Sequence, residues 1–248
     1  MATQPVIGYP PVVWFDILTA GTAAGGGFNP LTSIPWKYAW WADDPGWAGK
    51  PANGATFTSW PGAIGGQAFT ATTPPMTYRS AVTALNNRAG IDVSAAGCFP
   101  VAAATDTPQP ATVVVIFNLA SAVTNFMAFD TASGGRQFLR PNWSSKVEAY
   151  AGTVCDFGTA VVGPGAFLTV TTINGATSTV RINTTTYSGA TIGNPGTNTL
   201  GGLKLGSAGG VNQLAGNIPY VAVIGRALTA QETTDLQTWA KTYYGINT

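Results

Sequence analysis

The chain has 248 residues, of which 8% are charged and 45% are hydrophobic, and its formal net charge is +1. Without a basic excess it lacks the electrostatic footprint of a nucleic-acid-binding protein, so we expect no nucleic-acid partner. The hydrophobic content excludes a disordered chain. Since no run of 18 apolar residues occurs, we expect no membrane insertion. A chain of this length is suited to one all-β domain.

Residues 1–35 are predicted to form an irregular N-terminal arm, and residues 36–248 a single domain. Prolines and glycines interrupt any strand ladder within the arm. Its apolar run contains Trp14 and Phe15, and burying each of these side chains contributes roughly 1.5–3 kcal/mol. We therefore expect Trp14 and Phe15 to contact the domain or a partner. The first residues also lack a basic n-region and a long apolar stretch, so we expect no signal peptide.

The domain itself is predicted to consist of strands. Residues 112–118 form a nearly continuous apolar run, as expected of a strand that is buried on both faces. Asn174 and Gly175 separate two segments of alternating β-branched residues, which is the strongest signal for a tight hairpin in the chain. Further short apolar segments, separated by turn residues, continue to residue 224.

One amphipathic helix is predicted near the C-terminus. Thr229 and Glu232 have the spacing of a capping box, in which the hydroxyl and the carboxylate each bind a free backbone N–H group. Leu236, Trp239 and Tyr243 then recur at helical spacing and form one apolar stripe. We expect this stripe to face the sheets.

Two blocks of sequence carry a resemblance to a known family. The first has Ala-Trp-Trp-Ala-Asp at 39–43 and Thr-Ser-Trp at 58–60. The second has Leu-Lys-Leu-Gly-Ser at 203–207 and Arg-Ala-Leu-Thr at 226–229, and ends in Tyr-Gly at 244–245. These blocks resemble the concanavalin A-like lectin/glucanase superfamily in its laminin-G-like branch. The resemblance implies a jelly-roll β-sandwich with one C-terminal helix, but the fold hosts many unrelated functions.

The residues that most enzymes of this kind need are missing from the sequence. There is no histidine, which excludes Ser-His-Asp and Cys-His catalysis. Glycosidases of the superfamily carry two neighbouring glutamates, because a nucleophile and an acid must lie about 5–5.5 Å apart. Here Glu232 is assigned to the helix cap, and Glu148 has no carboxylate two or four residues away. We therefore expect no enzyme and no catalytic residue.

The remaining candidate ligands of metals or cofactors are few. Asp43 and Asp44 form the only acidic pair; they are either calcium ligands or, as we favour, turn residues. We expect no metal and no cofactor. Cys98 and Cys155 match no zinc spacing, and they are either buried and free or joined in one bridge.

Tryptophans are the remaining candidates for contact with a ligand or partner, because exposed Trp side chains stack on sugar rings and anchor interfaces. Trp47 and Trp143 stand in loop-like sequence, where we expect exposure. With Trp14 and Phe15 they make up the predicted contact residues. Trp60 and Trp239 fall where the family pattern requires core residues.

Two functions follow from these observations. The first is a phage virion structural protein, a capsid decoration or minor tail protein that exposes a lectin-like sandwich on the particle. Its partners would be other virion proteins in a multi-copy assembly, and its location the virion, after synthesis in the host cytoplasm. The low charge, the arm and the absent signal peptide favour it. The alternative is a carbohydrate-binding lectin module that recognises glycans of the host cell surface.

Overall fold

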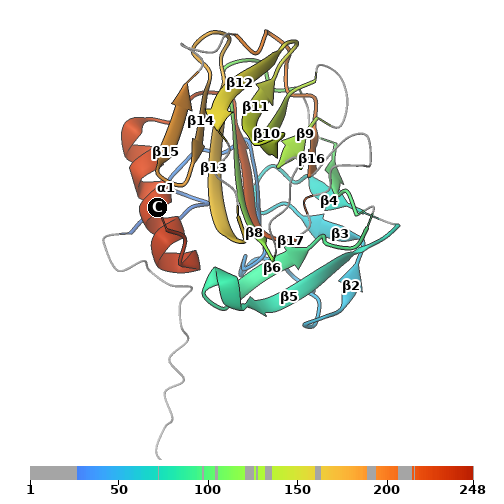
Figure 1. Ribbon diagram of the computed structural model, residues 1–248. Coiled ribbons are helices and arrows are strands. Elements are labelled where there is room, and N and C mark those ends of the chain that lie inside the picture. The colour runs from blue at the N-terminus through green and yellow to red at the C-terminus, as the bar shows by residue number, and fades with distance from the viewer. Residues whose placement is uncertain are drawn as a thin grey trace, which may run out of the picture.

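The protein is a two-layer β-sandwich with a helix packed on one side, as the computed structural model shows (Figure 1). The helix is α1 (Ala230–Tyr244). This architecture confirms the predicted all-β sandwich with one C-terminal helix. The structure describes residues 27–71, 73–96, 98–103, 106–120, 126, 128–131, 136–159, 163–188, 194–205, 214 and 216–247.

Both sheets are antiparallel where the structure describes them. One has the order β15 (Thr185–Ser188), β14 (Thr179–Ile182), β13 (Gly165–Ile173), β8 (Ala111–Leu119), β17 (Gly216–Ile224), β6 (Arg88–Asp92), β5 (Met76–Val82) and β2 (Thr56–Phe57), with β1 (Tyr38–Trp41) paired to β17. The other has the order β12 (Val154–Thr159), β11 (Lys146–Tyr150), β10 (Phe138–Trp143), β9 (Phe129–Asp130), β16 (Leu203–Leu205), β7 (Val101–Ala102), β4 (Ala68–Thr70) and β3 (Ser59–Pro61). We call the first the helix-side sheet and the second the far sheet. A short 3-10 turn, η1 (Thr83–Leu85), links β5 to β6.

Strand β8 lies at the centre of the helix-side sheet and is buried along its whole length. Successive side chains of a strand point to opposite faces. Val113, Val115 and Phe117 belong to the core between the two sheets, whereas Val114 and Ile116 belong to a second apolar cluster that includes the buried face of α1. The predicted strand at 112–118, buried on both faces, is confirmed.

Helix α1 begins and ends as its sequence predicts. The Thr229 hydroxyl accepts from the Glu232 N–H at 3.1 Å, and the Glu232 carboxylate accepts from the Thr229 N–H at 2.8 Å. Leu236 and Trp239 are buried against the helix-side sheet. The buried stripe continues to Tyr244 rather than Tyr243, whose ring is only half-buried.

The turn after β13 is wider than the Asn174-Gly175 signal predicts. Strand pairing stops at Thr172 and Thr179, so the connection is not a two-residue hairpin. The Ser178 hydroxyl accepts from the Asn174 N–H at 2.8 Å, and the Ser178 N–H donates to the Gly175 carbonyl at 3.2 Å. These bonds satisfy the backbone of a longer loop, and the loop closes one end of the site described below.

The first described residues lie on the sandwich. Ile34 is fully buried, and Phe28 and Leu31 pack on the same cluster as the helix. The Pro30 carbonyl accepts from the Tyr220 hydroxyl of β17 at 3.1 Å. The division at residue 35 stays a prediction. Among the described residues, no helix is long and apolar enough to cross a membrane.

Candidate functional site

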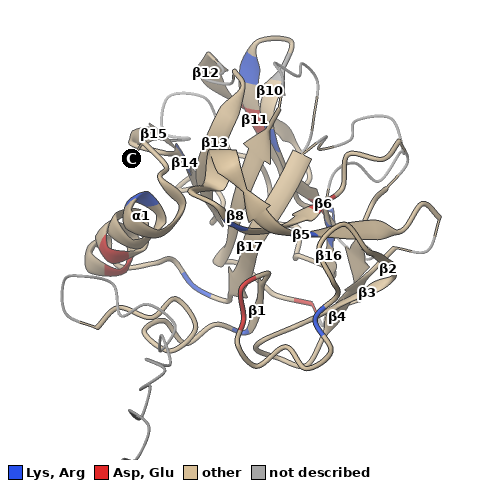
Figure 2. Ribbon diagram, turned by 90° about the horizontal axis from the view of Figure 1, so that it is seen from below, with Lys and Arg blue, Asp and Glu red and all other residues tan. Residues whose placement is uncertain are grey.

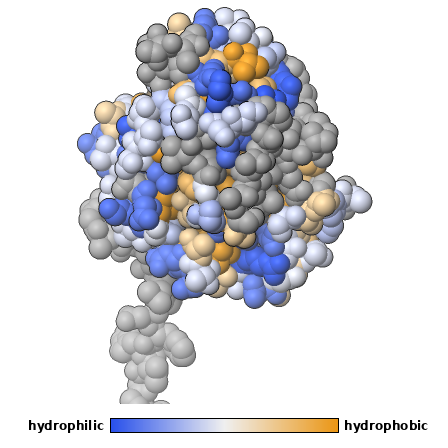
Figure 3. Space-filling model, viewed as in Figure 1, coloured by the Kyte–Doolittle hydropathy of each residue, from blue (hydrophilic) through white to orange (hydrophobic). Residues whose placement is uncertain are grey.

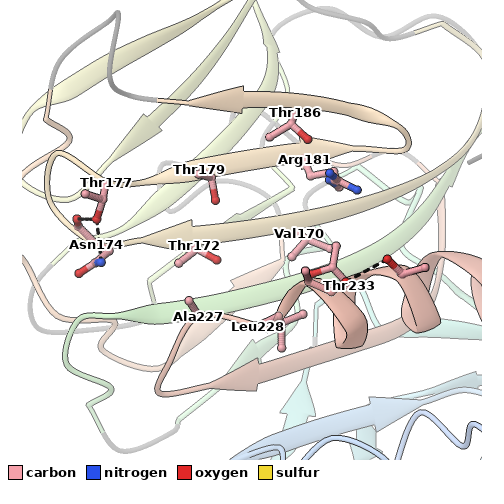
Figure 4. Close-up of a pocket in the computed structure, with 12 residues that line it drawn as sticks. Val170, Thr172, Asn174, Thr177, Thr179, Arg181, Thr186, Ala227, Leu228 and Thr233 are labelled. Atoms are coloured by element: carbon pink, nitrogen blue, oxygen red, sulfur yellow. Dashed lines mark hydrogen bonds between the residues drawn. The ribbon is translucent and has the colours of Figure 1, made fainter.

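A groove runs between α1 and the three strands β13, β14 and β15 at one end of the helix-side sheet, on its outer face (Figure 4). Its volume is about 360 Å³, which lies within the range of small-molecule sites, roughly 300–1,000 Å³. Threonine dominates its lining, which includes Thr172, Thr177, Thr179, Thr186, Thr233 and Thr234.

The floor of the groove follows from strand register. Thr172 of β13 lies opposite Thr179 of β14, and Arg181 of β14 lies opposite Thr186 of β15. Residues that are directly opposite on neighbouring strands project from the same face. Figure 4 shows their side chains on three adjacent strands, facing the helix.

Alternation along β14 explains why these residues face outward. Val180 and Ile182 point into the core between the sheets, so Thr179 and Arg181 must point away from it. The opposite wall comes from Ala230, Thr233 and Thr234 of α1; residues three and four apart share one face of a helix.

The threonine hydroxyls leave hydrogen-bonding capacity in the groove. Thr233 and Thr234 each donate to a helix carbonyl at 2.9 Å, so their oxygen lone pairs remain to accept from a ligand. Within the described part of the chain, the hydroxyls of Thr179 and Thr186 make no hydrogen bond. The groove therefore offers both donors and acceptors.

Arg181 stands where the groove joins a second hollow. Its Nη1 donates to Gln237 Oε1 of α1 at 2.8 Å, and Gln237 Nε2 donates to the Asn183 carbonyl at 2.7 Å. The second hollow, of about 430 Å³, shares Arg181 and Thr234 with the first and continues along the helix to Lys241. Together the two hollows form one site, which we call the helix groove.

The charge of the helix groove is positive. Its described lining includes Arg181 and Lys241 but neither Asp nor Glu. The nearest helix carboxylates are occupied elsewhere: hydrogen bonds from Arg226 lower the pKa of Glu232 to about 2, and Asp235 accepts from Gln231. Figure 2 shows that the fold carries few charged residues. Two positive charges, Arg181 and Lys241, in a lining without a carboxylate are therefore unusual for this protein.

The far sheet holds a pair of carboxylates that a search along one strand could not find. Glu148 of β11 lies directly opposite Asp156 of β12. Arg140 pairs with Glu148 at 3.0 Å, and Lys146 with Asp156 at 2.5 Å. The hydrogen bond from Lys146 lowers the pKa of Asp156, which is the reverse of the shift that a glycosidase general acid needs.

The predicted contact residues lie apart from the helix groove or outside the described residues. Trp47 is only 9% exposed, so its expected exposure is wrong. The turn folds its ring back onto Phe57 and Tyr78, at centroid distances of 5.7 and 5.8 Å. Trp143 ends β10, with its backbone paired to Lys146, and Trp14 and Phe15 fall outside the described residues.

Asp43 and Asp44 bind backbone and side-chain groups of the fold, and the two cysteines are buried. Asp44 Oδ1 accepts from the Gly46 N–H at 2.9 Å, which confirms the turn interpretation for that residue. Asp43 accepts from the Tyr243 hydroxyl at 3.1 Å and from the Ala89 N–H. Among the residues described, no group of three or more acidic, Cys or His side chains is placed to hold a metal ion. Cys98 and Cys155 are buried, and no disulfide joins them.

On the described surface, large hydrophobic side chains are seldom exposed. On the face seen in Figure 3, orange atoms occur in small groups among blue and white ones. Among the described residues, Val154 is a large hydrophobic residue with an exposed fraction of 51%. Isolated apolar residues of this kind are normal for a protein surface.

No protein-family model and no curated protein matches the chain. Solved structures do. A Trypanosoma rangeli sialidase bound to 2,3-difluorosialic acid matches with a TM-score of 0.54 and 12% identity, over 83% of this chain and 33% of the sialidase. The same sialidase in complex with sialic acid matches with a TM-score of 0.53 and 11% identity, over the same shares of each chain. Domain 4 of AbnA, a GH43 arabinanase from Geobacillus stearothermophilus, matches with a TM-score of 0.48 and 16% identity, over 65% of this chain and 81% of that domain.

These matches establish a shared sandwich fold, and this chain spans about a third of the sialidases' length. They also overturn the sequence-based conclusion that the chain is no enzyme, because sialidase chains contain this fold. The expectation that Glu148 has no neighbouring carboxylate is also wrong, since Asp156 lies opposite it on β12. The virion assignment, its partners and its location are tested by none of these observations and stay predictions.

Proposed function

We propose that the protein binds carbohydrate in the helix groove. The observation that carries the proposal is the set of threonine hydroxyls that line it from three strands and a helix. Sugar hydroxyls both donate and accept hydrogen bonds, and threonine hydroxyls do the same. The sialidase of similar fold is solved with sialic acid, which makes carbohydrate the first class of ligand to test.

Binding in this groove would depend on hydrogen bonds rather than on stacking, since its described lining has no aromatic ring. A typical hydrogen bond contributes about 1 kcal/mol net. Association itself costs at least about 4 kcal/mol, so a few such bonds without stacking leave a dissociation constant of roughly 1 mM or weaker. We expect weak binding to a single short saccharide.

Removing hydroxyls from the floor of the groove tests the proposal. A glycan array identifies a bound saccharide, and calorimetry then compares the wild type with Thr179→Val and Thr186→Val. Valine keeps the strand propensity of threonine and removes only the polar atom. We expect each variant to weaken binding severalfold, because each loses one hydrogen bond.

Thr185→Val is the matched control. Thr185 is exposed, adjoins Thr186 on β15 and does not line the groove, so this variant should bind as the wild type does. Equal affinity of all three variants for every saccharide bound by the wild type would place the binding site elsewhere. If no glycan binds on the array, and none binds in calorimetry at millimolar concentration, the proposal itself is contradicted.

A further inference from the structure

Arg181 differs from the other arginines of the chain. Four arginines form ion pairs, namely Arg79, Arg136, Arg140 and Arg226. Arg88 lies over the ring of Tyr243 at 4.0 Å. Within the described residues, Arg181 has neither a carboxylate nor a ring as partner, and its hydrogen bond goes to the neutral amide of Gln237. A guanidinium without a counter-ion keeps N–H donors whose planar geometry matches a carboxylate or phosphate.

The surroundings of Arg181 leave its charge uncompensated. It lines both hollows, and the described lining of neither contains a carboxylate. The other charged residue of the lining is Lys241, which has the same sign. A guanidinium has five N–H donors, so the bond to Gln237 leaves others for a carboxylate or sulfate, which it binds in a fork geometry.

The helix groove is also long. Its helix wall runs from Ala230 to Lys241, which spans roughly 16 Å at 1.5 Å per residue. A single sugar ring fills only part of that length. Arg181 lies between the two hollows, so a ligand that occupies both must pass it.

From these observations we infer that the helix groove takes an acidic oligosaccharide. The chain of sugars spans both hollows, and a carboxylate or sulfate on one sugar binds Arg181. Lys241 adds a second, more exposed positive charge at the far end. This inference rests on the proposed function, and it names the chemical class of the ligand.

Calorimetry with paired trisaccharides at low ionic strength tests the inference. The acidic probes are trigalacturonate and a sulfated galactotriose, and the neutral probe is galactotriose itself. We expect at least one acidic probe to bind about tenfold or more tightly than the neutral one, because hydrogen bonds to charged groups are the stronger ones. Arg181→Gln should lower the affinity for the acidic probe at least tenfold, and it should lower the affinity for galactotriose by a smaller factor, so that the preference disappears.

Two controls separate the helix groove from general charge effects. Lys241→Gln should reduce the preference less than Arg181→Gln does. Lys50→Gln removes a lysine that lies beside Trp47 and outside the groove, and it should have no effect. Circular dichroism confirms that each variant is folded.

The failures of the two proposals differ. Equal binding of neutral and acidic trisaccharides, unaffected by Arg181→Gln, overturns the inference and leaves carbohydrate binding in place. Inorganic sulfate or galacturonate monomer that binds as tightly as the trimers shows an anion site only, and also overturns it. If neither acidic trisaccharide binds, the inference fails, and the array result alone decides the proposed function.

Discussion

Arg181 of β14 and Gln237 of α1 are joined by a hydrogen bond of 2.8 Å, although 56 residues separate them in sequence. Gln237 donates in turn to the Asn183 carbonyl. The Gln237 side chain thus bridges Arg181 and the backbone that follows β14. The position of the guanidinium therefore depends on how the helix docks.

This relationship predicts a positioning role for Gln237. Gln237→Ala frees Arg181 without removing its charge, so the preference for an acidic trisaccharide should fall severalfold while neutral binding persists. Gln231→Ala, which changes an exposed glutamine of the same helix, should leave that preference intact. Calorimetry on the two variants checks this, and an unchanged preference in Gln237→Ala would contradict the positioning role.

Docking of the helix is predicted to depend on Trp239. Its side chain is 3% exposed and its ring lies 5.2 Å from those of Tyr220 and Tyr244. Trp239→Ala should lower the free energy of unfolding by about 3–5 kcal/mol, the usual cost of deleting a large buried side chain. Urea denaturation measures it, and a loss below about 1 kcal/mol would show that the helix is not docked as described.

Acid should weaken the start of α1. Hydrogen bonds from Arg226 and Thr229 hold the pKa of Glu232 near 2, below its ordinary value of 4.5. A carboxylate with a lowered pKa stabilises the fold above its unfolded pKa, and this contribution disappears as the pH falls from about 4.5 through about 2. Glu232→Gln should lack this part of the pH dependence. If the free energy of unfolding of the wild type and of Glu232→Gln falls equally with pH across that range, the stabilising role of the Glu232 carboxylate is contradicted.

The two carboxylates of the far sheet should respond differently to neutralisation. Glu148 and Arg140 are largely shielded, with 13% and 17% of their side chains exposed. Glu148→Gln leaves Arg140 without its ion-pair partner there, and we expect a loss of about 1–3 kcal/mol. Asp156→Asn breaks a pair with the exposed Lys146 and also removes a like charge opposite Glu148. Those two effects on stability oppose each other. The unfolding midpoint of Asp156→Asn in urea should therefore change less than the midpoint of Glu148→Gln. A larger change in Asp156→Asn would contradict this prediction.

Local signals in the sequence were enough to predict single elements. The apolar run at 112–118 predicted a doubly buried strand, and Thr229 with Glu232 predicted the start of the helix. Both depend on residues close together in the chain, where side-chain periodicity and capping chemistry act directly.

Contacts between residues of different elements could not be predicted from the sequence. Alternation in β14 indicates that Arg181 points outward, but only the tertiary structure places Gln237 opposite it. Strand register likewise brings Asp156 to Glu148. The loop-like sequence around Trp47 predicted exposure, yet the fold buries the ring against residues that come ten and more positions later.

The most direct test is a titration of isotope-labelled protein with the acidic trisaccharide that binds more tightly, trigalacturonate or sulfated galactotriose, followed by amide and side-chain NMR shifts. We predict that the largest changes occur at Thr179, Arg181, Thr186 and Gln237, which lie on both sides of the helix groove, and that the Arg181 guanidinium signal shifts with them. Changes confined to the far sheet or to the surroundings of Trp47, with these four residues unaffected, would contradict the assignment of the helix groove as the binding site.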